Sequence, residues 1–365
     1  MTSTSSQRKV VVQVVQHLSP GGIESICLEL QSFAGANAEV HLVSLEGRES
    51  QMVSLWPRLS QYAGVMHFLD KPPGLQPRLL LKLAALFKTL KADVVHTHHI
   101  GPLLYGGAAA RLARIPVLIH TEHDAWHLGL DNHQSLASKC LKFIRPQLVA
   151  DAEIVADHIR SRIPHAQPRV IPNGIDTRRF KPGDKAAARR SFGLPDDQAI
   201  IGCAARMHEV KGHDVLLDAM FRLPPNVHLA LAGKGPQEAQ LQRQVRDLNL
   251  SDRVHFLGLV DDMPRFYQAL DVFCLASKAE GMPLSPLEAQ ACGARAVITD
   301  VGGSREALCP TTGILVPADN SAALAKALRY SLRTTLSADP RDFVMRHRDI
   351  RGMVAAYDQL HSVAC

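Results

Sequence analysis

The chain has 365 residues, which is enough for about two domains that each bury a core. Hydrophobic residues make up 46% and charged residues 21%, a composition that excludes collagen-like, low-complexity and disordered proteins. The net charge of +6 favours anionic ligands or an anionic membrane face only mildly, and solubility explains it equally well.

The first half of the chain alternates short apolar runs with segments of helical spacing. Residues 10–16 are rich in valine, as expected for a strand buried in a parallel sheet. A Ser-Pro-Gly-Gly turn at 19–22 leads into a predicted helix over 23–33. The later strands predicted in this half are 40–45, 93–97, 116–121, 154–156 and 169–171, and the later helices are 75–90 and 106–113.

A second series of the same kind follows a region dense in turn residues, at 172–174 and 181–184. Its predicted strands are 199–204, 227–232, 254–257, 272–275, 296–299 and 314–316, and its predicted helices are 215–221, 238–248, 286–292 and 322–333. Strands that alternate with such helices indicate an α/β fold of two similar doubly wound domains with parallel sheets. Ligands of these sheets bind at the carboxyl ends of the strands.

Two glycines lie directly after the first predicted strand. Gly21 and Gly22 open the helix that follows, so the backbone can approach a ligand closely there. The free N–H groups at the start of a helix also attract a phosphate. The dinucleotide fingerprint GxGxxG is absent, and a plain tight turn is the alternative interpretation.

Two cations follow the first predicted strand of the second half. Arg206 and Lys211 are five positions apart, and Gly212 comes directly after the lysine. A guanidinium offers a planar fork and an ammonium a point charge, a combination that suits a diphosphate. Two solvated surface charges are the alternative, although their place at the carboxyl end of a strand favours the binding role.

Glu280 and Glu288 mark a third candidate site, on the loop and helix after the strand 272–275. Pro283 and Pro286 suit the entry into that helix. Eight helical residues rise about 12 Å, which exceeds the roughly 5–10 Å between the two carboxyls of a glycosidase. The pair therefore indicates two groups that bind hydroxyls. A helix cap and a solvated glutamate are the alternative.

Histidines are dense between 96 and 133. They are His96, His98, His99, His120, His123, His127 and His133. Neither HExxH nor DxD occurs, so a metal site is disfavoured. The segment His120-Thr121-Glu122-His123 follows the strand 116–121, so one of these residues could line a cleft between the domains as a single catalytic or acceptor-binding histidine. A core or surface histidine is the alternative.

These motifs occur in one order along the chain. Gly21-Gly22 is followed by Thr121-x-His123, Pro172-Asn173-Gly174-Ile175-Asp176 with Phe180, Arg206 with Lys211-Gly212, Phe256-Leu257-Gly258, Glu280-x7-Glu288 and Val301-Gly302-Gly303 with Glu306. The order resembles that of GT-B glycosyltransferases of the retaining family 4 type (glycosyltransferase group 1) over nearly the whole chain. Arg295 stands where that family usually has Pro, and Arg305 is an unexpected charge that leaves the donor sugar open.

The resemblance implies two Rossmann-like domains that face each other across a cleft. The acceptor domain is expected over 1–178 and the nucleotide-sugar donor domain over 179–341. The segment 342–365 has apolar residues on one face and is predicted as a single amphipathic helix that returns to the first domain.

The resemblance also implies a role for each motif residue. Arg206 and Lys211 would hold the diphosphate, Glu288 the ribose hydroxyls and Glu280 the donor sugar, while His123 would lie near the reacting hydroxyls. The implied catalytic residues are His123, Arg206, Lys211 and Glu280. The implied donor-binding residues are Gly21, Gly22, Asn173, Arg206, Lys211, Leu257, Glu280, Gly281, Met282, Leu284 and Glu288.

The expected activity is transfer of a hexose, with retention of configuration, from a nucleotide-diphosphate sugar to a glycan or lipid-linked acceptor in surface polysaccharide or glycolipid biosynthesis. A UDP-sugar is the favoured donor and GDP-mannose the second candidate. No metal or other cofactor is expected, because Arg206 and Lys211 can stabilise the leaving diphosphate. A GT-B nucleotide-sugar epimerase is the alternative. The intact Arg206, Lys211, Glu280 and Glu288 set disfavours a non-catalytic partner subunit.

Cysteines, the N-terminus and the basic segments bear on location and partners. The seven scattered cysteines form no CxxC pair, and the apolar run 10–15 is too short for a signal sequence or a membrane span. A cytoplasmic protein is therefore expected. The basic, leucine-rich helix 75–90 and the basic segment 139–190 make an anionic membrane a candidate partner, with solvated cations as the alternative. Few aromatics disfavour nucleic acid.

Overall fold

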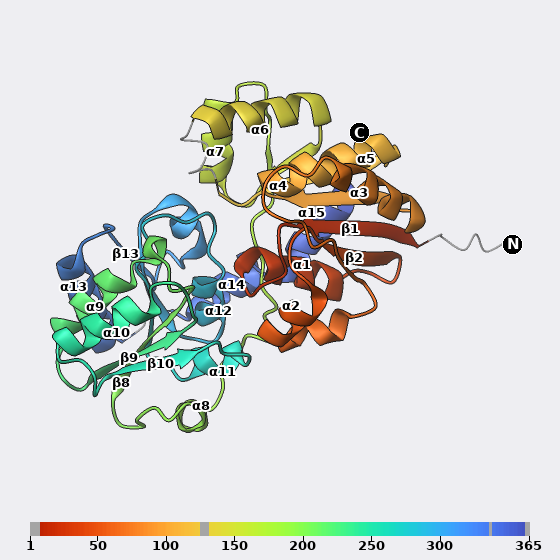
Figure 1. Cartoon of the computed structure of the whole chain (residues 1–365). Helices are drawn as coiled ribbons and strands as arrows, with labels where there is room; N and C mark the ends of the chain where they lie inside the picture. Colours follow the sequence, from red (N-terminus) through yellow and green to blue (C-terminus); the bar gives the residue numbers. More distant parts are fainter. Residues whose placement is uncertain (1–7, 125–130, 336–337, 362–365) are drawn as a thin grey trace, which may run out of the picture. The chain divides into compact units, whose positions relative to one another are not determined.

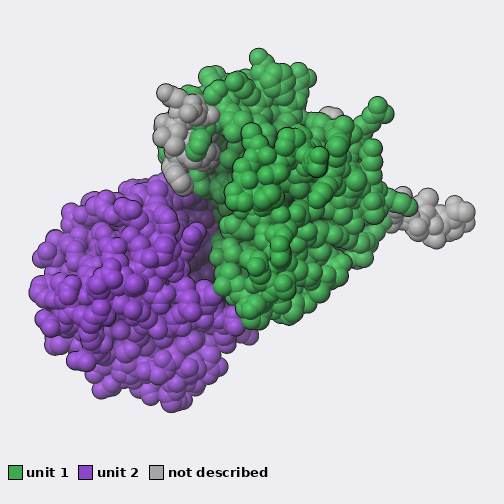
Figure 2. All heavy atoms as spheres, in the orientation of Figure 1, with its two compact units in different colours: residues 1–174, 350–365 green, residues 175–349 purple. Residues whose placement is uncertain are grey.

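The computed structural model describes residues 8–124, 131–335 and 338–361. The chain forms two compact units (Figure 2). Unit 1 comprises residues 1–174 and 350–365, and unit 2 comprises residues 175–349. Each unit is built around one parallel sheet with helices on its faces (Figure 1). The predicted α/β class with two Rossmann-like domains is therefore confirmed.

The sheet of unit 1 has the order β3-β2-β1-β4-β5-β6-β7. Its strands are β1 (Lys9–Val15), β2 (Ala38–Ser44), β3 (Met66–Phe68), β4 (Val94–His98), β5 (Val117–Glu122), β6 (Gln147–Ala150) and β7 (Arg169–Val170). The sequence analysis did not predict β3 or β6. The strand predicted at 154–156 is wrong, because these residues lie in the helix α7 (Glu153–Arg162), whose buried residues follow helical spacing.

Helices cover both faces of this sheet. One face packs on α1 (Gly22–Ser32) and η1 (Pro57–Tyr62), which follows the short helix α2 (Glu49–Leu55). The other face packs on α3 (Arg78–Thr89), α5 (Ala108–Ala113) and α6 (Asp131–Ile144). The alternation along β1 explains this division, since Val12 and Val14 contribute to the second core and Val15 to the first. Between β4 and α5 lie α4 (Ile100–Pro102) and the π-helix η2 (Leu103–Gly107).

The sheet of unit 2 has the order β10-β9-β8-β11-β12-β13. Its strands are β8 (Ala199–Ala204), β9 (Val227–Ala232), β10 (Val254–Gly258), β11 (Val272–Leu275), β12 (Arg295–Thr299) and β13 (Ile314–Val316). Its helices are α8 (Lys185–Ser191), η4 (Glu209–Lys211), α9 (His213–Phe221), α10 (Glu238–Asp247), α11 (Met263–Gln268), α12 (Ser285–Ala291), η5 (Gly302–Ala307), α13 (Ser321–Arg333) and α14 (Pro340–His347). All six predicted strands of this half are present.

The prediction of one helix at the end of the chain is wrong. Two helices occur, α14 in unit 2 and α15 (Ile350–Leu360) in unit 1. They are separated because the backbone N–H of Ile175 donates to the Arg348 carbonyl, and Ile175 pairs with Asp349 in an isolated bridge. The Arg341 guanidinium holds α14 on carbonyls of unit 2, while Tyr357 joins α15 to β5 of unit 1. The chain passes from one unit to the other between 174 and 175 and again between 349 and 350. The predicted boundaries were 178/179 and 341/342.

Both sheets reverse their strand order at their first strand. β1 lies between β2 and β4, and β8 lies between β9 and β11. Loops on the two sides of such a switch point leave the sheet in opposite directions, and a ligand can enter between them. This topology puts the loops after β1 and β4, and those after β8 and β11, at the ligand-binding edges of their units. Among the described residues, no helix is both long and apolar enough to cross a bilayer.

Candidate functional site

Glycines join the loops at the carboxyl end of the unit 2 sheet. Gly212 has a φ of +62°, and a Cβ atom there would lie 2.0 Å from the carbonyl oxygen of Ala276. Gly302 has a φ of +49°, and a Cβ atom there would lie 1.9 Å from the carbonyl oxygen of Glu280. Only glycine allows backbones to approach this closely. The loop after β11 is thereby held between the loops after β8 and β12.

The loop after β9 is held in the same manner. A Cβ atom at Gly233 would lie 2.1 Å from the carbonyl oxygen of Ala205, and one at Gly235 would lie 2.3 Å from that of Met207. The Met207 N–H also donates to the Lys234 carbonyl at 3.1 Å. Four loops therefore converge at one edge of unit 2, which is the edge where parallel sheets bind ligands.

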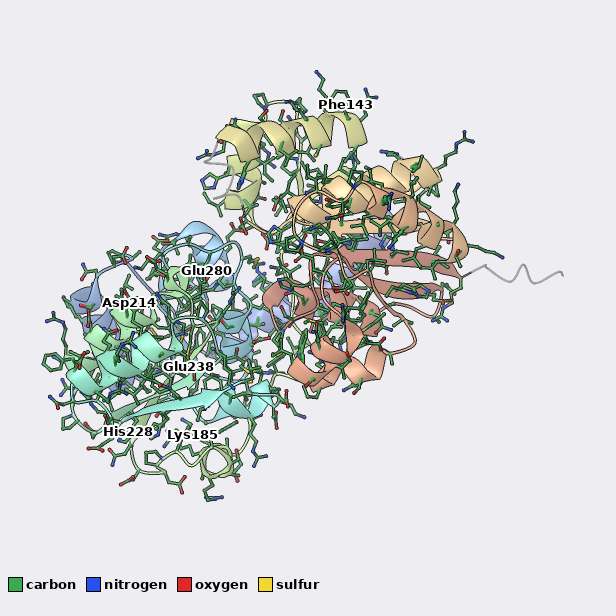
Figure 3. All side chains as sticks on the ribbon, viewed as in Figure 1. Phe143, Lys185, Asp214, His228, Glu238 and Glu280 are labelled. Carbon is green, nitrogen blue, oxygen red and sulfur yellow. The ribbon has the colours of Figure 1, made fainter. Side chains whose placement is uncertain are left out.

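Lys211 and Glu280 meet at the centre of these loops. The Lys211 Nζ lies 2.6 Å from Glu280 Oε1, and the Ser277 hydroxyl donates to the same oxygen at 2.5 Å. Thr299 Oγ1 in turn donates to the Ser277 carbonyl at 2.6 Å. The Glu280 side chain is only 7% exposed, so its charge needs these partners. Figure 3 labels Glu280 in unit 2.

Arg206 begins the same loop and is exposed, whereas its neighbour Met207 is fully buried and anchors the backbone. None of the carboxylates described in the structure forms an ion pair with Arg206. Its five N–H donors therefore face solvent at the ligand-binding edge. Arg206 and Lys211 bring two positive charges to this loop, and the exposed Glu209 between them and the buried Glu280 bring two negative charges.

Glu288 lies in α12, directly after the loop that carries Glu280. The buried Tyr267 hydroxyl on α11 donates to Glu288 Oε2 at 2.6 Å. Burial and the charge of Glu288 raise the pKa of Tyr267 well above its ordinary value, so the phenol stays a donor. Tyr267 thus fixes the orientation of a half-buried carboxylate at the edge of the sheet.

The other predicted donor-binding residues of unit 2 lie on the same loops. Gly281, Met282 and Leu284 connect β11 to α12, with Met282 buried and the other two half-buried. Leu257 is half-buried at the end of β10, where the register with β9 shifts at Gly258. The structure therefore brings the predicted unit 2 residues to one edge.

At the edge of unit 1, Gly21 and Gly22 are exposed at the start of α1. A Cβ atom at Gly21 would lie 2.2 Å from Glu24 Oε2, and Glu24 itself lies 3.1 Å from His17 Nδ1. The first N–H groups of α1 therefore remain at the surface, as a phosphate site requires. The nearby carboxylate of Glu24 is a feature that the sequence analysis did not identify.

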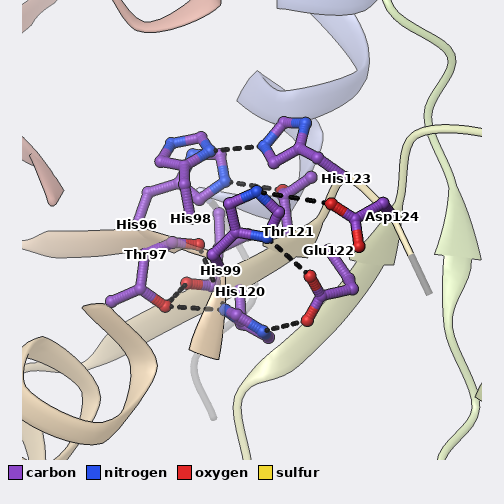
Figure 4. A network of polar contacts seen from close by, with 10 residues as sticks. His96, Thr97, His98, His99, His120, Thr121, Glu122, His123 and Asp124 are labelled. Atoms are coloured by element: carbon purple, nitrogen blue, oxygen red, sulfur yellow. Dashed lines mark hydrogen bonds and ion pairs between the residues drawn. The ribbon is translucent and has the colours of Figure 1, made fainter. Parts of the chain in front are cut away.

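His123, predicted as a catalytic residue, is buried just after β5. Its Nε2 atom lies 2.9 Å from His98 Nδ1, and its Nδ1 atom lies 3.4 Å from Asp151 Oδ2 (Figure 4 shows the histidine contact). His98 Nε2 lies 2.8 Å from Gln13 Oε1. Asn173, predicted to bind the donor, donates from Nδ2 to Asp151 Oδ2 at 2.9 Å. Both ring nitrogens of His123 thus face side chains of unit 1.

These contacts run from Gln13 through His98 and His123 to Asp151, and the Gln13 oxygen decides which ring nitrogens carry protons. The Gln13 oxygen only accepts, so His98 Nε2 carries the proton of His98, and His98 Nδ1 accepts from His123 Nε2. Neutral His123 then directs the lone pair of Nδ1 toward Asp151. Burial lowers the pKa of His123 to about 3 and raises the pKa of Asp151 well above its ordinary value. Both shifts favour a neutral His123 beside a protonated Asp151.

The pKa of His99 is raised, in contrast to that of His123. Its φ of +67° and ψ of 167° lie in a region that costs a non-glycine residue about 1–3 kcal/mol. Its Nδ1 atom lies 2.9 Å from Glu122 Oε1, and its Nε2 atom lies 3.8 Å from Asp124 Oδ2. Burial opposes the charge, but the hydrogen bond and charge of Glu122 prevail and raise the pKa of His99 to about 9. The side chain is 31% exposed, so an imidazolium stands at this edge.

Several residues of the two edges were not found from the sequence. They are Glu24, Glu122, Asp151, Tyr267, Ser277 and Thr299. Asp151, Ser277 and Thr299 each lie at or within two residues of the carboxyl end of a strand, and this position is the signal that could have identified them. Within the three described ranges, no group of at least three His, Cys, Asp or Glu side chains is arranged to hold a metal ion. His127, one of the counted histidines, lies outside those ranges.

Comparison with known proteins places both units in one family. The family described as "Glycosyltransferase Family 4" matches residues 20–179, and that described as "Glycosyl transferases group 1" matches residues 184–344. A lipopolysaccharide core biosynthesis mannosyltransferase of Rhizobium meliloti is 33% identical over 52% of this chain and 60% of its own length. A D-inositol 3-phosphate glycosyltransferase of Geodermatophilus obscurus is 32% identical over 73% of this chain and 66% of its own.

A longer match and a solved structure complete the comparison. The D-inositol 3-phosphate glycosyltransferase of Mycolicibacterium gilvum is 32% identical over 85% of this chain and 75% of its own length. The structure of Anabaena HepE with UDP and glucose has the same fold, with a TM-score of 0.84 and 22% identity over 97% of this chain and 100% of that one. The first two curated relatives are matched over less than two thirds of their length. On these matches, and with a GT-B type of fold, the chain belongs to glycosyl transferases group 1, glycosyltransferase family 4.

Proposed function

We propose that the chain transfers a sugar from a nucleotide-diphosphate sugar to a hydroxyl of a glycan or lipid-linked acceptor. The observation that carries the proposal is the Lys211 ammonium, held by Glu280 among four converging loops at the carboxyl edge of unit 2. This edge combines cations with fixed carboxylates. Cations suit a diphosphate, and carboxylates suit the hydroxyls of a sugar and a ribose.

In this proposal the diphosphate binds to Arg206 and Lys211. Cleavage of the bond between the anomeric carbon and the phosphate oxygen builds negative charge on the leaving diphosphate. Two positioned cations stabilise that charge without needing to reorganise, and loss of one such group typically costs about 10²–10³ in rate. Lys211 would exchange part of its contact with Glu280 for the phosphate, which frees the Glu280 carboxylate for a hydroxyl of the donor sugar.

Glu288 is proposed to accept hydrogen bonds from the ribose hydroxyls, with Leu257 beside the base. The support is that Tyr267 fixes the Glu288 carboxylate from behind at 2.6 Å, so its orientation is set before a ligand arrives. A UDP-sugar is the favoured donor, because the related fold of Anabaena HepE is described with UDP and glucose. GDP-mannose is the second candidate, since a relative from Corynebacterium glutamicum is described as GDP-mannose-dependent.

The transfer is proposed to retain the anomeric configuration and to need no metal. In a front-face reaction the leaving phosphate oxygen takes the proton of the acceptor hydroxyl, while the acceptor oxygen bonds to the anomeric carbon on the same face. This route needs no protein nucleophile. A surface polysaccharide or glycolipid is the proposed setting of the acceptor, because the relatives above are described as acting in lipopolysaccharide core biosynthesis or on phosphatidylinositol mannosides.

A thermal-shift screen of the full chain tests the donor site. Selective binding to the native state raises the melting temperature, so UDP and GDP are compared with their sugars, each with and without a chelator. Stabilisation by one nucleotide that persists with the chelator and is lost in Lys211→Ala supports the proposal. Equal melting temperatures for all ligands would contradict it.

Product analysis separates a transferase from an epimerase. The donor selected by the screen is incubated alone and with a candidate acceptor, and the sugars are identified. A glycosylated acceptor with retained configuration is expected. Conversion of the donor into its epimer without acceptor would instead support the epimerase, although the relatives reported above are all described as transferases.

A further inference from the structure

One surface of unit 1 is strongly basic. It is formed by the solvent-facing sides of α3, α5 and α6 and by the residues that end these helices, and we name it the basic face. Its cations are Arg78, Lys82, Lys88, Lys91, Arg111, Arg114, Lys139, Lys142 and Arg145. All are exposed except Arg111, which is half-buried. The three helices cover the same side of the sheet, because their inward residues share one core.

No acidic side chain balances this charge within the parts of these helices whose side chains are described. The ion pairs found in the described chain include none of the nine cations. Asp93, the one carboxylate between 72 and 121, is half-buried and accepts a hydrogen bond from the Val10 N–H at 2.8 Å. The field of the basic face therefore acts outward, toward an anionic partner.

Large apolar side chains stand among these cations. Phe143 on α6 is 78% exposed, Leu81 on α3 is 65% exposed and Leu112 on α5 is 54% exposed. Figure 3 labels Phe143 at the outer edge of unit 1. Each helix of the face carries at least one such residue, and these three side chains are turned away from the core. Isolated exposed apolar residues are common, but three among uncompensated cations indicate a surface that is partly covered in use.

A hollow beside Phe143 lies between α5 and the end of α6. Its volume is about 490 Å³, and its lining includes Arg111, Phe143 and Arg145. The Arg111 guanidinium donates to the carbonyls of Ile144 and Arg145 at 2.6 Å each, so it ties α5 to the C-terminal end of α6. Arg111, Phe143 and Arg145 thus lie on two elements that hydrogen bonds tie together.

We infer that the basic face docks unit 1 on an anionic phospholipid bilayer, with the cations at the phosphate groups and with Phe143, Leu112 and Leu81 entering the interface. Charge complementarity identifies the partner class, since basic helices with apolar residues among the cations bind anionic membrane surfaces. Nucleic acid would match the charge alone, and it would leave the protruding leucines without a role. This inference does not depend on the proposed function, because it concerns binding and not turnover.

Co-sedimentation of the full chain with vesicles tests the inference. Vesicles of equimolar phosphatidylcholine and phosphatidylglycerol should bind the protein, and vesicles of phosphatidylcholine alone should not. Each cation at an anionic surface contributes about fivefold to binding. The triple variant Lys82→Gln, Lys139→Gln, Lys142→Gln should therefore bind roughly a hundredfold more weakly.

A charge-matched variant of unit 2 provides the control. Arg243→Gln, Arg246→Gln and Lys326→Gln remove the same charge from exposed helix positions outside the basic face. This variant should bind the mixed vesicles as the unaltered protein does. An equal loss of binding in both triple variants would mean that only net charge matters and would overturn the inference.

Insertion is measured separately, with tryptophan reporters. Phe143→Trp should be quenched by brominated phosphatidylcholine in mixed vesicles, whereas Phe221→Trp should not, because Phe221 is 59% exposed on unit 2. The native tryptophans give the background, which the unaltered protein measures. Absence of binding to mixed vesicles at low salt would overturn the inference. Tight binding of an RNA or DNA oligonucleotide in place of vesicles would overturn it as well.

Discussion

The carboxyl edges of the two sheets are held together by different means. In unit 2, Gly212 and Gly302 let the backbones of neighbouring loops touch, and the contacts depend on the absence of a Cβ atom. In unit 1, side chains join the strand ends, and His98, His123 and Asp151 form a buried polar chain. The first edge is therefore sensitive to added volume, and the second to the number of bound protons. The unit 2 edge carries the cations Arg206 and Lys211, which suit that edge to a diphosphate.

The largest expected effect is on unit 2. Lys211→Ala removes the cation beside Glu280 and should lower turnover about 10²–10³-fold, while the far-UV circular dichroism stays unchanged. Lys278→Ala serves as the control, because it deletes another lysine of this unit that is paired with carboxylates, those of Asp214 and Asp319. Steady-state kinetics with the donor found by the screen measure both variants. Near-normal turnover in Lys211→Ala would contradict the proposed role.

Acid should act first on unit 1. His96, His98 and His123 are buried with lowered pKa values, so below about pH 6.5 the unfolded chain binds protons that the native chain does not. Each such proton costs roughly 1.4 kcal/mol of stability per pH unit as the pH falls. Asp151, whose pKa burial raises, acts in the opposite direction and offsets about one of the three protons.

Unit 2 has one fully buried histidine of this kind in the described chain, His213, whose pKa burial lowers to about 4. Hydrogen–deuterium exchange of the full chain compares the units at about pH 7 and pH 5 after correction for the intrinsic rate. Strand peptides of unit 1 should lose protection first. His99 adds nothing to this loss, because its raised pKa stabilises the fold up to about 9 and the charge is present throughout this range. Earlier loss in unit 2 would refute the comparison.

Added volume should act most strongly on unit 2, because a Cβ atom at Gly302 meets a backbone oxygen, whereas one at Gly21 of unit 1 meets the end of the flexible Glu24 side chain. Gly302→Ala places a Cβ atom 1.9 Å from the Glu280 carbonyl oxygen in addition to the penalty for its positive φ. Gly193→Ala, with a φ of +64° and no atom within 4 Å, carries the backbone penalty alone. We expect about 1 kcal/mol of destabilisation for the control and about 2–3 kcal/mol for Gly302→Ala. Urea denaturation measures both. Equal values would show that the loop contact is relaxed.

The sequence was sufficient for those parts of the fold that follow from local pattern. The valine-rich run at β1 and the six strands of unit 2 are short and continuous in their apolar residues, so their positions could be predicted. β3 and β6 were not predicted, because neither Met66–Phe68 nor Gln147–Ala150 is a continuous apolar run. The division between α14 and α15 also escaped prediction, since it is set by the pairing of Ile175 with Asp349, which is distant in sequence.

The site shows the same limit. Arg206, Lys211, Glu280 and Glu288 could be found because their spacing is a motif, and the structure brings them to one edge. Their supporting groups could not, because Tyr267 approaches Glu288 from another helix. The protonation states were equally out of reach, since the high pKa of His99 and the low pKa of His123 depend on which carboxylate each ring meets.

Asp151 offers the smallest effect and a direct test of the neutral pair. His123 Nδ1 and Asn173 Nδ2 both contact the same atom of Asp151, Oδ2. If His123 is neutral and Asp151 protonated, the hydroxyl at Oδ2 donates to the ring and accepts from Asn173, whereas the amide of Asp151→Asn can keep only one of these interactions at that position. Asp151→Ala removes both interactions, and each buried group that loses its partner costs about 1–3 kcal/mol. Urea denaturation at about pH 7 should therefore give a smaller loss of stability for Asp151→Asn than for Asp151→Ala. An equal loss in both variants would contradict the neutral pair, because it would mean that stability depends on the carboxylate charge that both variants lack.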